Sequence, residues 1–199
     1  MLHPAYKPVY QAGIRLTDLV VGSGSPFNPY CGSNASTLIT NEEFPTPNPD
    51  WVDVVTTFLT PNGPLREVYR RGTKGQPGYE MEFLLKEPND ILKLLSMPYE
   101  TFPFSRQHFD EKSAAIGDEG IVVFGLDHGM YALQRCIGSE NFALWHLEYP
   151  DIIAEASHTY AQRVYGHAQA ALDHGVRGVF GWVGPELCIP PLMPVDSFD

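Results

Sequence analysis

Cysteine is scarce in this chain of 199 residues, which contains only Cys31, Cys136 and Cys188. The number is odd, the spacings are wide and no Cys-x-x-Cys pair is present, so the pattern argues against a disulfide scaffold. Reduced, buried thiols are the expected state, as is usual in the cytosol. We therefore expect a cytoplasmic protein without structural disulfides.

Basic residues and long apolar runs are also scarce. The chain has 13 lysines and arginines against 24 aspartates and glutamates, which gives a formal net charge of -11. The phosphate backbone repels a protein of this charge, so nucleic acid is not an expected partner. No apolar run approaches the roughly 18 residues that a membrane span needs, and the first residues lack the charged-then-apolar order of a signal peptide. We expect no membrane association.

What the chain has instead is a globular composition rich in turn formers. Apolar residues make up 43% of it and charged residues 19%, which is enough for a sizeable core. Glycines and prolines, 18 of each, form dense clusters at 22–26 and 45–49. Fixed φ angles and missing N–H donors at such prolines disfavour regular elements. The sequence predicts an irregular segment over residues 1–50, with a short helix near 12–21.

Alternating and β-branched patterns then predict three strands. The run at 51–59 is followed by the turn signal Thr60-Pro61-Asn62-Gly63 and by a second run at 64–70, which predicts a β-hairpin. Residues 79–85 begin with alternating apolar and acidic side chains and predict a strand covered on one face. Pro88 predicts the start of a short helix.

The second half shows the order of elements of a β-α-β unit. Residues 120–125 form a continuous apolar run, typical of a strand covered on both faces, and 177–182 form the next strand. Helices are expected between them, at 129–137, at 140–148 and from Asp151 as N-cap to Gly175 as stop. Such short connections predict a right-handed crossover and a parallel sheet or barrel.

The last residues, 194–199, look like the first turn of a further helix. Only two or three βα units are visible, whereas a closed barrel of eight units takes about 250 residues. We therefore expect a chain that is truncated at its C-terminus relative to a complete barrel.

Several motifs of the chain resemble those of one enzyme family. They are the hairpin, a helix ending in Leu-Leu-Ser-Met-Pro, the Val-Val-Phe-Gly-Leu strand running into Tyr-Ala-Leu-Gln-Arg-Cys-Ile-Gly, a helix opened by Tyr-Pro-Asp, and Gly-Pro-Glu-Leu-Cys-Ile-Pro-Pro-Leu-Met-Pro at 184–194. Their order over residues 50–199 resembles the uroporphyrinogen decarboxylase superfamily, which includes cobalamin-dependent methyltransferases. The resemblance implies an α/β fold, with a partial TIM-type (β/α) barrel over 51–199 and an N-terminal β-hairpin extension. Its active site would lie at the C-terminal ends of the strands.

Departures from the family pattern bear on the reaction. Where the decarboxylase has a substrate-contacting tyrosine, this chain has Leu133, and near the position of the decarboxylase serine it has Trp182. The arginine-bearing N-terminal motif of the family is matched only weakly at 11–15, where an extra Ile breaks the spacing. The catalytic aspartate motif of the decarboxylase has no convincing counterpart in this chain. The resemblance therefore favours methyl transfer on a tetrapyrrole or corrinoid-linked substrate. Uroporphyrinogen decarboxylation in porphyrin biosynthesis stays the alternative.

The resemblance also bears on metal content. In the methyltransferase branch a His-x-Cys pair and a later Cys hold zinc, which favours the thiolate form of a bound thiol. No His-x-Cys occurs in this chain. The resemblance thus implies zinc only for a full-length methyltransferase parent and no metal for a decarboxylase, and it leaves other cofactors unassigned.

Three polar residues are the candidate catalytic groups. Asp127 and His128 directly follow the apolar strand, where they could orient a base, bind a metal or meet a cationic substrate. Glu186 lies in a rigid Gly-Pro-Glu loop and could act as an acid or a base. Structural roles stay open as well: Asp127 could cap a helix, His128 could be a solvated loop residue, and Glu186 could accept hydrogen bonds from loop N–H groups.

Other polar residues are expected to be structural. His158 and His174 are predicted to be solvated, and the basic cluster Arg70, Arg71 and Lys74 would either attract an acidic substrate or serve solubility. Two further hypotheses concern the whole chain. It could be an inactive folding or interaction unit that self-associates through exposed barrel edges, or a small-molecule binder without turnover.

Overall fold

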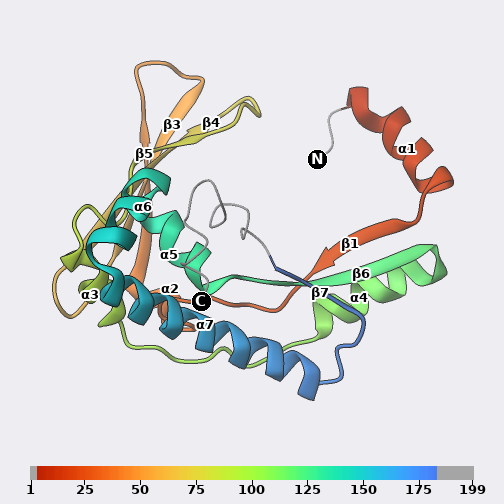
Figure 1. Ribbon diagram of the computed structural model, residues 1–199. Coiled ribbons are helices and arrows are strands. Elements are labelled where there is room, and N and C mark those ends of the chain that lie inside the picture. The colour runs from red at the N-terminus through yellow and green to blue at the C-terminus, as the bar shows by residue number, and fades with distance from the viewer. Residues whose placement is uncertain (1–3, 183–199) are drawn as a thin grey trace. The chain divides into compact units, whose positions relative to one another are not determined.

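The computed structural model describes residues 4–182, so Glu186 and Cys188 lie outside the described residues (Figure 1). The chain folds into two compact units, each assembled from separate stretches of sequence. Within the described residues, the first unit comprises 4–26, 103–126 and 166–182, and the second comprises 27–102 and 127–165. The fold is mixed α/β, with one parallel and one antiparallel sheet.

The sheet of the first unit is parallel. Its strands β1 (Leu19–Ser23), β6 (Gly120–Leu126) and β7 (Val179–Trp182) are hydrogen-bonded in the order β1-β6-β7 (Figure 1). The 3-10 turn Pro4–Tyr6 and helix α1 (Lys7–Leu16) precede β1, while α4 (Gln107–Ile116) and the 3-10 turn Gly117–Glu119 precede β6. The parallel pairing of β6 with β7 confirms the predicted β-α-β arrangement.

One face of this parallel sheet is packed. Val122, Phe124 and Leu126 of β6 are buried on it. The ring of Phe124 has its centroid 6.5 Å from that of Phe109 on α4 and 5.7 Å from that of His167 on α7 (Pro150–Asp173). Apolar burial is the main favourable free energy that holds these helices on the sheet.

The opposite face of the parallel sheet is exposed. Val20 pairs with Ile121, and Val123 with Val179, and alternation along each strand puts all four on this face. Val20, Ile121 and Val179 are 68%, 48% and 46% exposed. The prediction that both faces are covered is therefore wrong for the described residues. A continuous apolar run favours an extended backbone, but it does not say what packs against it.

The second unit contains an antiparallel meander. Its strands β2 (Ile39–Pro45), β3 (Trp51–Phe58), β4 (Leu65–Gly72) and β5 (Tyr79–Glu82) neighbour one another in sequence order (Figure 1). The β3–β4 pair confirms the predicted hairpin, and its turn holds Gly63 at φ +107°, a left-handed conformation that favours glycine. The third predicted strand is present, but it ends at Glu82 rather than at residue 85.

The helices of the second half largely match their prediction. The second unit contains α2 (Ala35–Leu38), α3 (Asn89–Leu95), α5 (Gly129–Ile137), α6 (Ser139–Glu148) and the first part of α7. Helix α7 begins at Pro150, so Asp151 lies in its first turn and is not its N-cap. Gly175, at φ +83°, follows the end of α7 as predicted.

One apolar core holds the helices of the second unit against its sheet. Tyr30 and Tyr160 belong to it, and their rings meet edge to face with centroids 5.5 Å apart. Other large members are fully or almost fully buried: Phe58, Leu65, Leu84, Leu85, Ile91, Leu94, Leu133, Ile137, Phe142 and Ile153.

Residues 1–50 are not the irregular segment that the sequence predicts, because they contain α1, β1, α2 and β2. Apart from Gly13 inside α1, their glycines and prolines lie between these elements or within two residues of an end, so most of these residues mark the limits of helices and strands and do not prevent them. The described residues form no closed barrel. None of the described helices is both long and apolar enough to cross a membrane.

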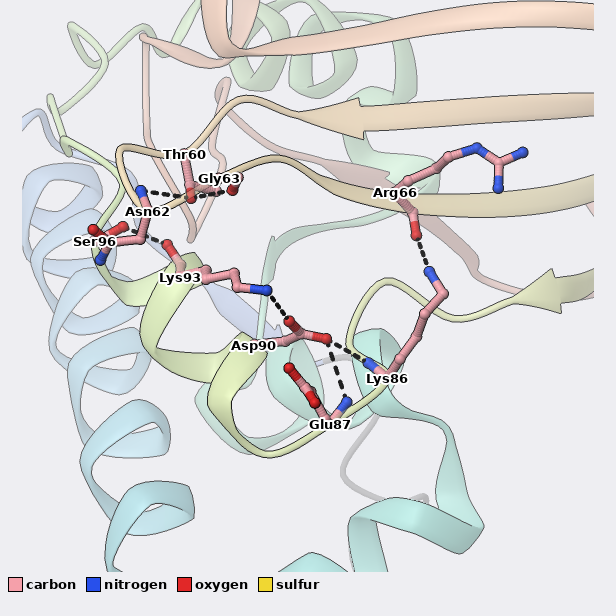
Figure 2. Close-up of polar contacts among 9 residues, drawn as sticks. All are labelled: Thr60, Asn62, Gly63, Arg66, Lys86, Glu87, Asp90, Lys93 and Ser96. Carbon is pink, nitrogen blue, oxygen red and sulfur yellow. Dashed lines mark hydrogen bonds and ion pairs between the residues drawn. The ribbon is translucent and has the colours of Figure 1, made fainter.

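A buried carboxylate organises the start of α3. Asp90 accepts hydrogen bonds from the backbone N–H groups of Lys86 (2.9 Å) and Glu87 (3.3 Å) and from the ammonium group of Lys93 (2.7 Å), as Figure 2 shows. Its side chain is 8% exposed. Burial by itself raises the pKa of Asp90, but these hydrogen bonds outweigh it and hold the pKa below its ordinary value.

We expect Asp90→Asn to destabilise the protein by about 2 kcal/mol at neutral pH, because a hydrogen-bonded buried charge is lost. The carboxylate stabilises the fold above its unfolded-state pKa of about 3.9, and this stabilisation disappears as the pH falls through the lowered folded-state pKa. Urea unfolding of both proteins between pH 7 and pH 3 measures this. Asp110→Asn, in the exposed Arg106 pair, is the control and should show a much smaller loss. A constant difference across the range would contradict the assignment.

The two core tyrosines provide a second, matched test. The hydroxyl group of Tyr30 donates to the backbone carbonyl of Ala132 at 2.7 Å, whereas the buried hydroxyl of Tyr160 has no hydrogen-bond partner among the described residues. Tyr30→Phe should cost about 1–3 kcal/mol of unfolding free energy, because it leaves buried partners unsatisfied. Tyr160→Phe should be neutral or stabilising. Denaturant unfolding measures the free energy of unfolding of both variants. Equal losses in the two would contradict the assignment of a hydrogen bond to Tyr30 alone.

Candidate functional site

The turn that follows β6 holds two of the predicted site residues. Asp127 and His128 come directly after β6, and His128 is the N-cap of α5 with an extended backbone. The carbonyl oxygen of His128 accepts the first helical hydrogen bond from the N–H group of Ala132 at 2.9 Å. Asp127 is therefore not the helix cap, and the turn geometry is fixed by α5.

Close packing of α5 on α7 further fixes this turn. Gly129 is buried, and a Cβ atom at its position would lie 2.6 Å from the backbone nitrogen of Ala161 and 2.7 Å from the carbonyl oxygen of Ser157. Only a residue without a side chain fits there. The neighbouring His128 is thus held by backbone packing.

His128 is a half-buried imidazole with an unsatisfied nitrogen. Its Nδ1 atom is buried and has no hydrogen-bond partner among the described residues. Burial lowers the pKa of His128 below its ordinary value, so the ring is neutral at neutral pH. A neutral imidazole with an unpartnered nitrogen can accept or relay a proton.

Helix α5 also carries Arg135, whose guanidinium is bound to a buried tyrosine. Its Nη2 atom donates to the hydroxyl oxygen of Tyr30 at 2.9 Å, and the Sγ atom of Cys136 lies 3.2 Å from the same oxygen. Burial raises the pKa of Tyr30 well above its ordinary value and that of Cys136 to about 12, so both groups stay protonated. Because the Tyr30 hydroxyl hydrogen goes to Ala132, its lone pairs face Arg135.

Three carboxylates act electrostatically on Arg135 or feel its charge. They are Asp127, Glu67 of β4 and Glu80 of β5. Burial raises the pKa of Glu67, and the positive charge of Arg135 offsets this only in part. Burial and the negative charge of Glu67 together raise the pKa of Glu80. These two glutamates therefore bind protons more readily than ordinary surface carboxylates.

The structure thus brings Asp127 and His128 together and adds residues that the sequence does not single out. Glu80 is one of the acidic residues of the alternating run in β5 and gives no signal of its own, whereas Glu67 is half-buried and shares a strand face with buried Leu65, so an acidic residue at this alternate position of β4 is the signal that could reveal it. Tyr30 lies in a turn-rich segment that gives no such signal. Glu186 and Cys188 lie outside the described residues.

The basic cluster predicted at residues 70–74 is neutralised. Each cation has a carboxylate partner, and the pairs are Arg70–Asp53 at 2.7 Å, Arg71–Glu43 at 2.7 Å and Lys74–Asp50 at 2.6 Å. Its role is therefore to connect strands and loops of the second unit rather than to attract an anion. His158 and His174 are exposed as predicted, whereas His167 is buried against aromatic rings.

The described residues do not fit a metal. Among them, no group of three or more His, Cys, Asp and Glu side chains could hold a metal ion. Cys31 and Cys136 are buried free thiols, and burial raises the pKa of Cys31 to about 11, which disfavours the thiolate that zinc needs. No protein-family profile, curated protein or solved structure matches this chain.

The packing at Gly129 gives a test of how the turn is held. We expect Gly129→Ala to destabilise the protein by about 1–3 kcal/mol, because the new methyl group overlaps the α7 backbone. Gly166→Ala on α7, where a Cβ would meet nothing within 4 Å, is the control and should stabilise the helix by up to about 1 kcal/mol. Thermal unfolding measures both. An unchanged melting temperature for Gly129→Ala would show that α5 does not need this approach.

Proposed function

We propose that this chain is a partial (β/α) barrel of the uroporphyrinogen decarboxylase superfamily. In this proposal the protein works in the cytoplasm on a tetrapyrrole or corrinoid-linked substrate. Its reaction is methyl transfer to a thiol rather than decarboxylation. The observation that carries the proposal is a parallel sheet with one bare apolar face, whose middle strand leads directly into Asp127 and His128.

A parallel sheet that is packed by helices on only one face is an unusual arrangement. Such sheets occur almost only with both faces covered, either by helices or by the inside of a barrel. The bare face here bears Val20, Ile121, Val123 and Val179 and no charged residue. An apolar face of this kind suits a barrel interior, where further strands bring side chains to fill it.

The side chains on the same face become smaller toward the carboxyl ends of the strands. Gly22, Gly125 and Gly181 lie on it toward the carboxyl ends, beyond the valines and the isoleucine. Glycines leave space where barrel enzymes bind substrate, at the carboxyl ends of the strands. Asp127 and His128 follow the middle strand at that end.

The chemistry of thiol methylation needs a group that takes the thiol proton. In the proposed reaction the acceptor thiol gives its proton to neutral His128, and its sulfur then bonds to the methyl carbon. The bond between the methyl carbon and the donor breaks at the same time, and its electron pair stays with the demethylated donor. Since the described residues do not fit zinc, no step is assigned to it.

A direct assay tests this function on the purified chain. Methylcobalamin and a simple thiol are the substrates, and the methylated thiol is measured by mass spectrometry. His128→Gln and Asp127→Asn should lower the rate by roughly 10²-fold or more, as expected for a lost proton-transfer group or its neighbour. Asp118→Asn, in the exposed turn at the other end of β6, is the control and should leave the rate unchanged.

The pH profile separates a base from a structural role. The rate should rise with pH through the lowered pKa of His128, because only the neutral ring accepts a proton, and this rise should vanish in His128→Gln. Full activity of metal-free protein on uroporphyrinogen would overturn methyl transfer in favour of decarboxylation. Absence of both activities, with self-association of the chain, would overturn the enzyme proposal in favour of an interaction unit.

A further inference from the structure

We propose that Ser23 and His108 of the first unit form a nucleophile–base pair that cleaves small carboxylic esters through an acyl-serine intermediate. The Oγ atom of Ser23 lies 3.4 Å from the Nδ1 atom of His108, although the two residues are 85 positions apart in the chain. A hydroxyl group beside an imidazole nitrogen is the arrangement that activates serine for attack on a carbonyl carbon. This activity goes beyond the proposed methyl transfer, which uses Asp127 and His128 of the second unit.

The parallel sheet holds the nucleophile at one end of a strand. Ser23 is the last residue of β1, and its backbone is in register with that of the fully buried Phe124 on β6. Ser23 keeps 9% of its surface exposed. Gly24, which follows it, borders open space, because a Cβ atom there would meet no described atom within 4 Å. The hydroxyl group is therefore fixed by the sheet and lies at the carboxyl end of a parallel strand, where open α/β sheets bind their ligands.

Helix α4 brings the base and a favourable electrostatic field. His108 is the second residue of α4 and is exposed. The first N–H groups of a helix have no acceptor within the helix, so its N-terminus favours negative charge. Asp110, the acidic residue of this turn, is paired with Arg106 at 2.7 Å. Because His108 belongs to the same turn, the oxyanion that forms when Ser23 attacks an ester would be stabilised by this end of α4.

Two further serines connect the segment after β1 to the start of α4. The backbone N–H group of Ser105 donates to the Oγ atom of Ser25 at 3.1 Å. The backbone N–H group of Gln107 donates to the Oγ atom of Ser105 at 3.3 Å. These hydrogen bonds hold the two segments together before any substrate binds. Such positioning lowers the entropic cost of bringing a nucleophile and its base together.

The reaction needs only the ester and water. The Oγ atom of Ser23 bonds to the carbonyl carbon of the ester while its proton moves to Nδ1 of neutral His108. The bond from that carbon to the leaving oxygen then breaks, and the leaving oxygen takes both the electron pair and the proton held by His108, so an alcohol departs. Water attacks the acyl-serine in the same way, with His108 again as the base, and releases the carboxylic acid and free Ser23.

The burial of Ser23 limits the size of the acyl group. A hydroxyl group on a residue that is only 9% exposed is reached by a short acyl chain more readily than by a long one. We therefore expect acetate esters to react faster than the corresponding decanoate esters.

The test incubates the full chain with p-nitrophenyl acetate and locates the bound acetyl group by peptide mass spectrometry. Ser23 should be acetylated, with a burst of p-nitrophenolate, and Ser23→Ala should remove both. His108→Gln should lower the rate of Ser23 acetylation by roughly 10²-fold or more, as expected for a lost general base. Ser36→Ala is the matched control and should change nothing. Ser36 is more exposed than Ser23, so reaction by accessibility alone would favour it.

Imidazole rescue separates a base from a residue that only holds α4 against β1. Because His108 is exposed, free imidazole can reach the space that His108→Gln leaves, and it should restore part of the Ser23 acetylation in this variant but none in Ser23→Ala. Circular dichroism checks that each variant is folded. The inference is overturned if Ser36 is acetylated as fast as Ser23, if His108→Gln leaves the rate of Ser23 acetylation unchanged, or if imidazole restores nothing to a folded His108→Gln.

Discussion

The hydrogen bond between the Tyr30 hydroxyl and the Ala132 carbonyl is the contact on which the polar site of the second unit depends. It joins residues 102 positions apart in the chain, and thus ties the segment before the antiparallel sheet to α5. The ring of Tyr30 belongs to the apolar core, while its oxygen orients Arg135. One buried side chain therefore couples core packing to the placement of a charged group at the surface. Because leaving the buried Tyr30 hydroxyl without this acceptor would cost free energy, the contact favours the packing in which α5 presents that carbonyl.

The bare face of the parallel sheet is the second constraint, and its size limits what can cover it. Three strands about 4.8 Å apart and four to seven residues long form a face of only a few hundred Å². A stable interface between separate proteins buries roughly 800 Å² on each partner. Contact through this face alone is therefore too small to hold two copies together. In the barrel that we propose, strands that continue the same sheet would cover this face without the entropic cost of association.

Local signals in the sequence predict much of this fold. The β3–β4 hairpin, α5, α6 and the parallel pairing of β6 with β7 follow from turn residues and apolar periodicity, which act within a few residues. The same local signals fail before residue 50. There β1 and β2 are short and lie between clusters of glycine and proline, so the sequence shows no periodicity that would predict them. Some residues of the candidate site could likewise be predicted from local signals, and others could not. Asp127 and His128 could be found because they follow a strong strand signal. The electrostatic effect of Arg135 on Glu67 could not, because it joins residues far apart in the chain and follows no local pattern.

Burial moves the proton affinities of polar groups in the second unit in opposite directions. Taking a group out of water disfavours its charged form, so the same physical effect lowers the pKa of His128 and raises that of Glu67. Near neutral pH the unit then holds an uncharged base and a carboxyl group that is closer than usual to holding its proton.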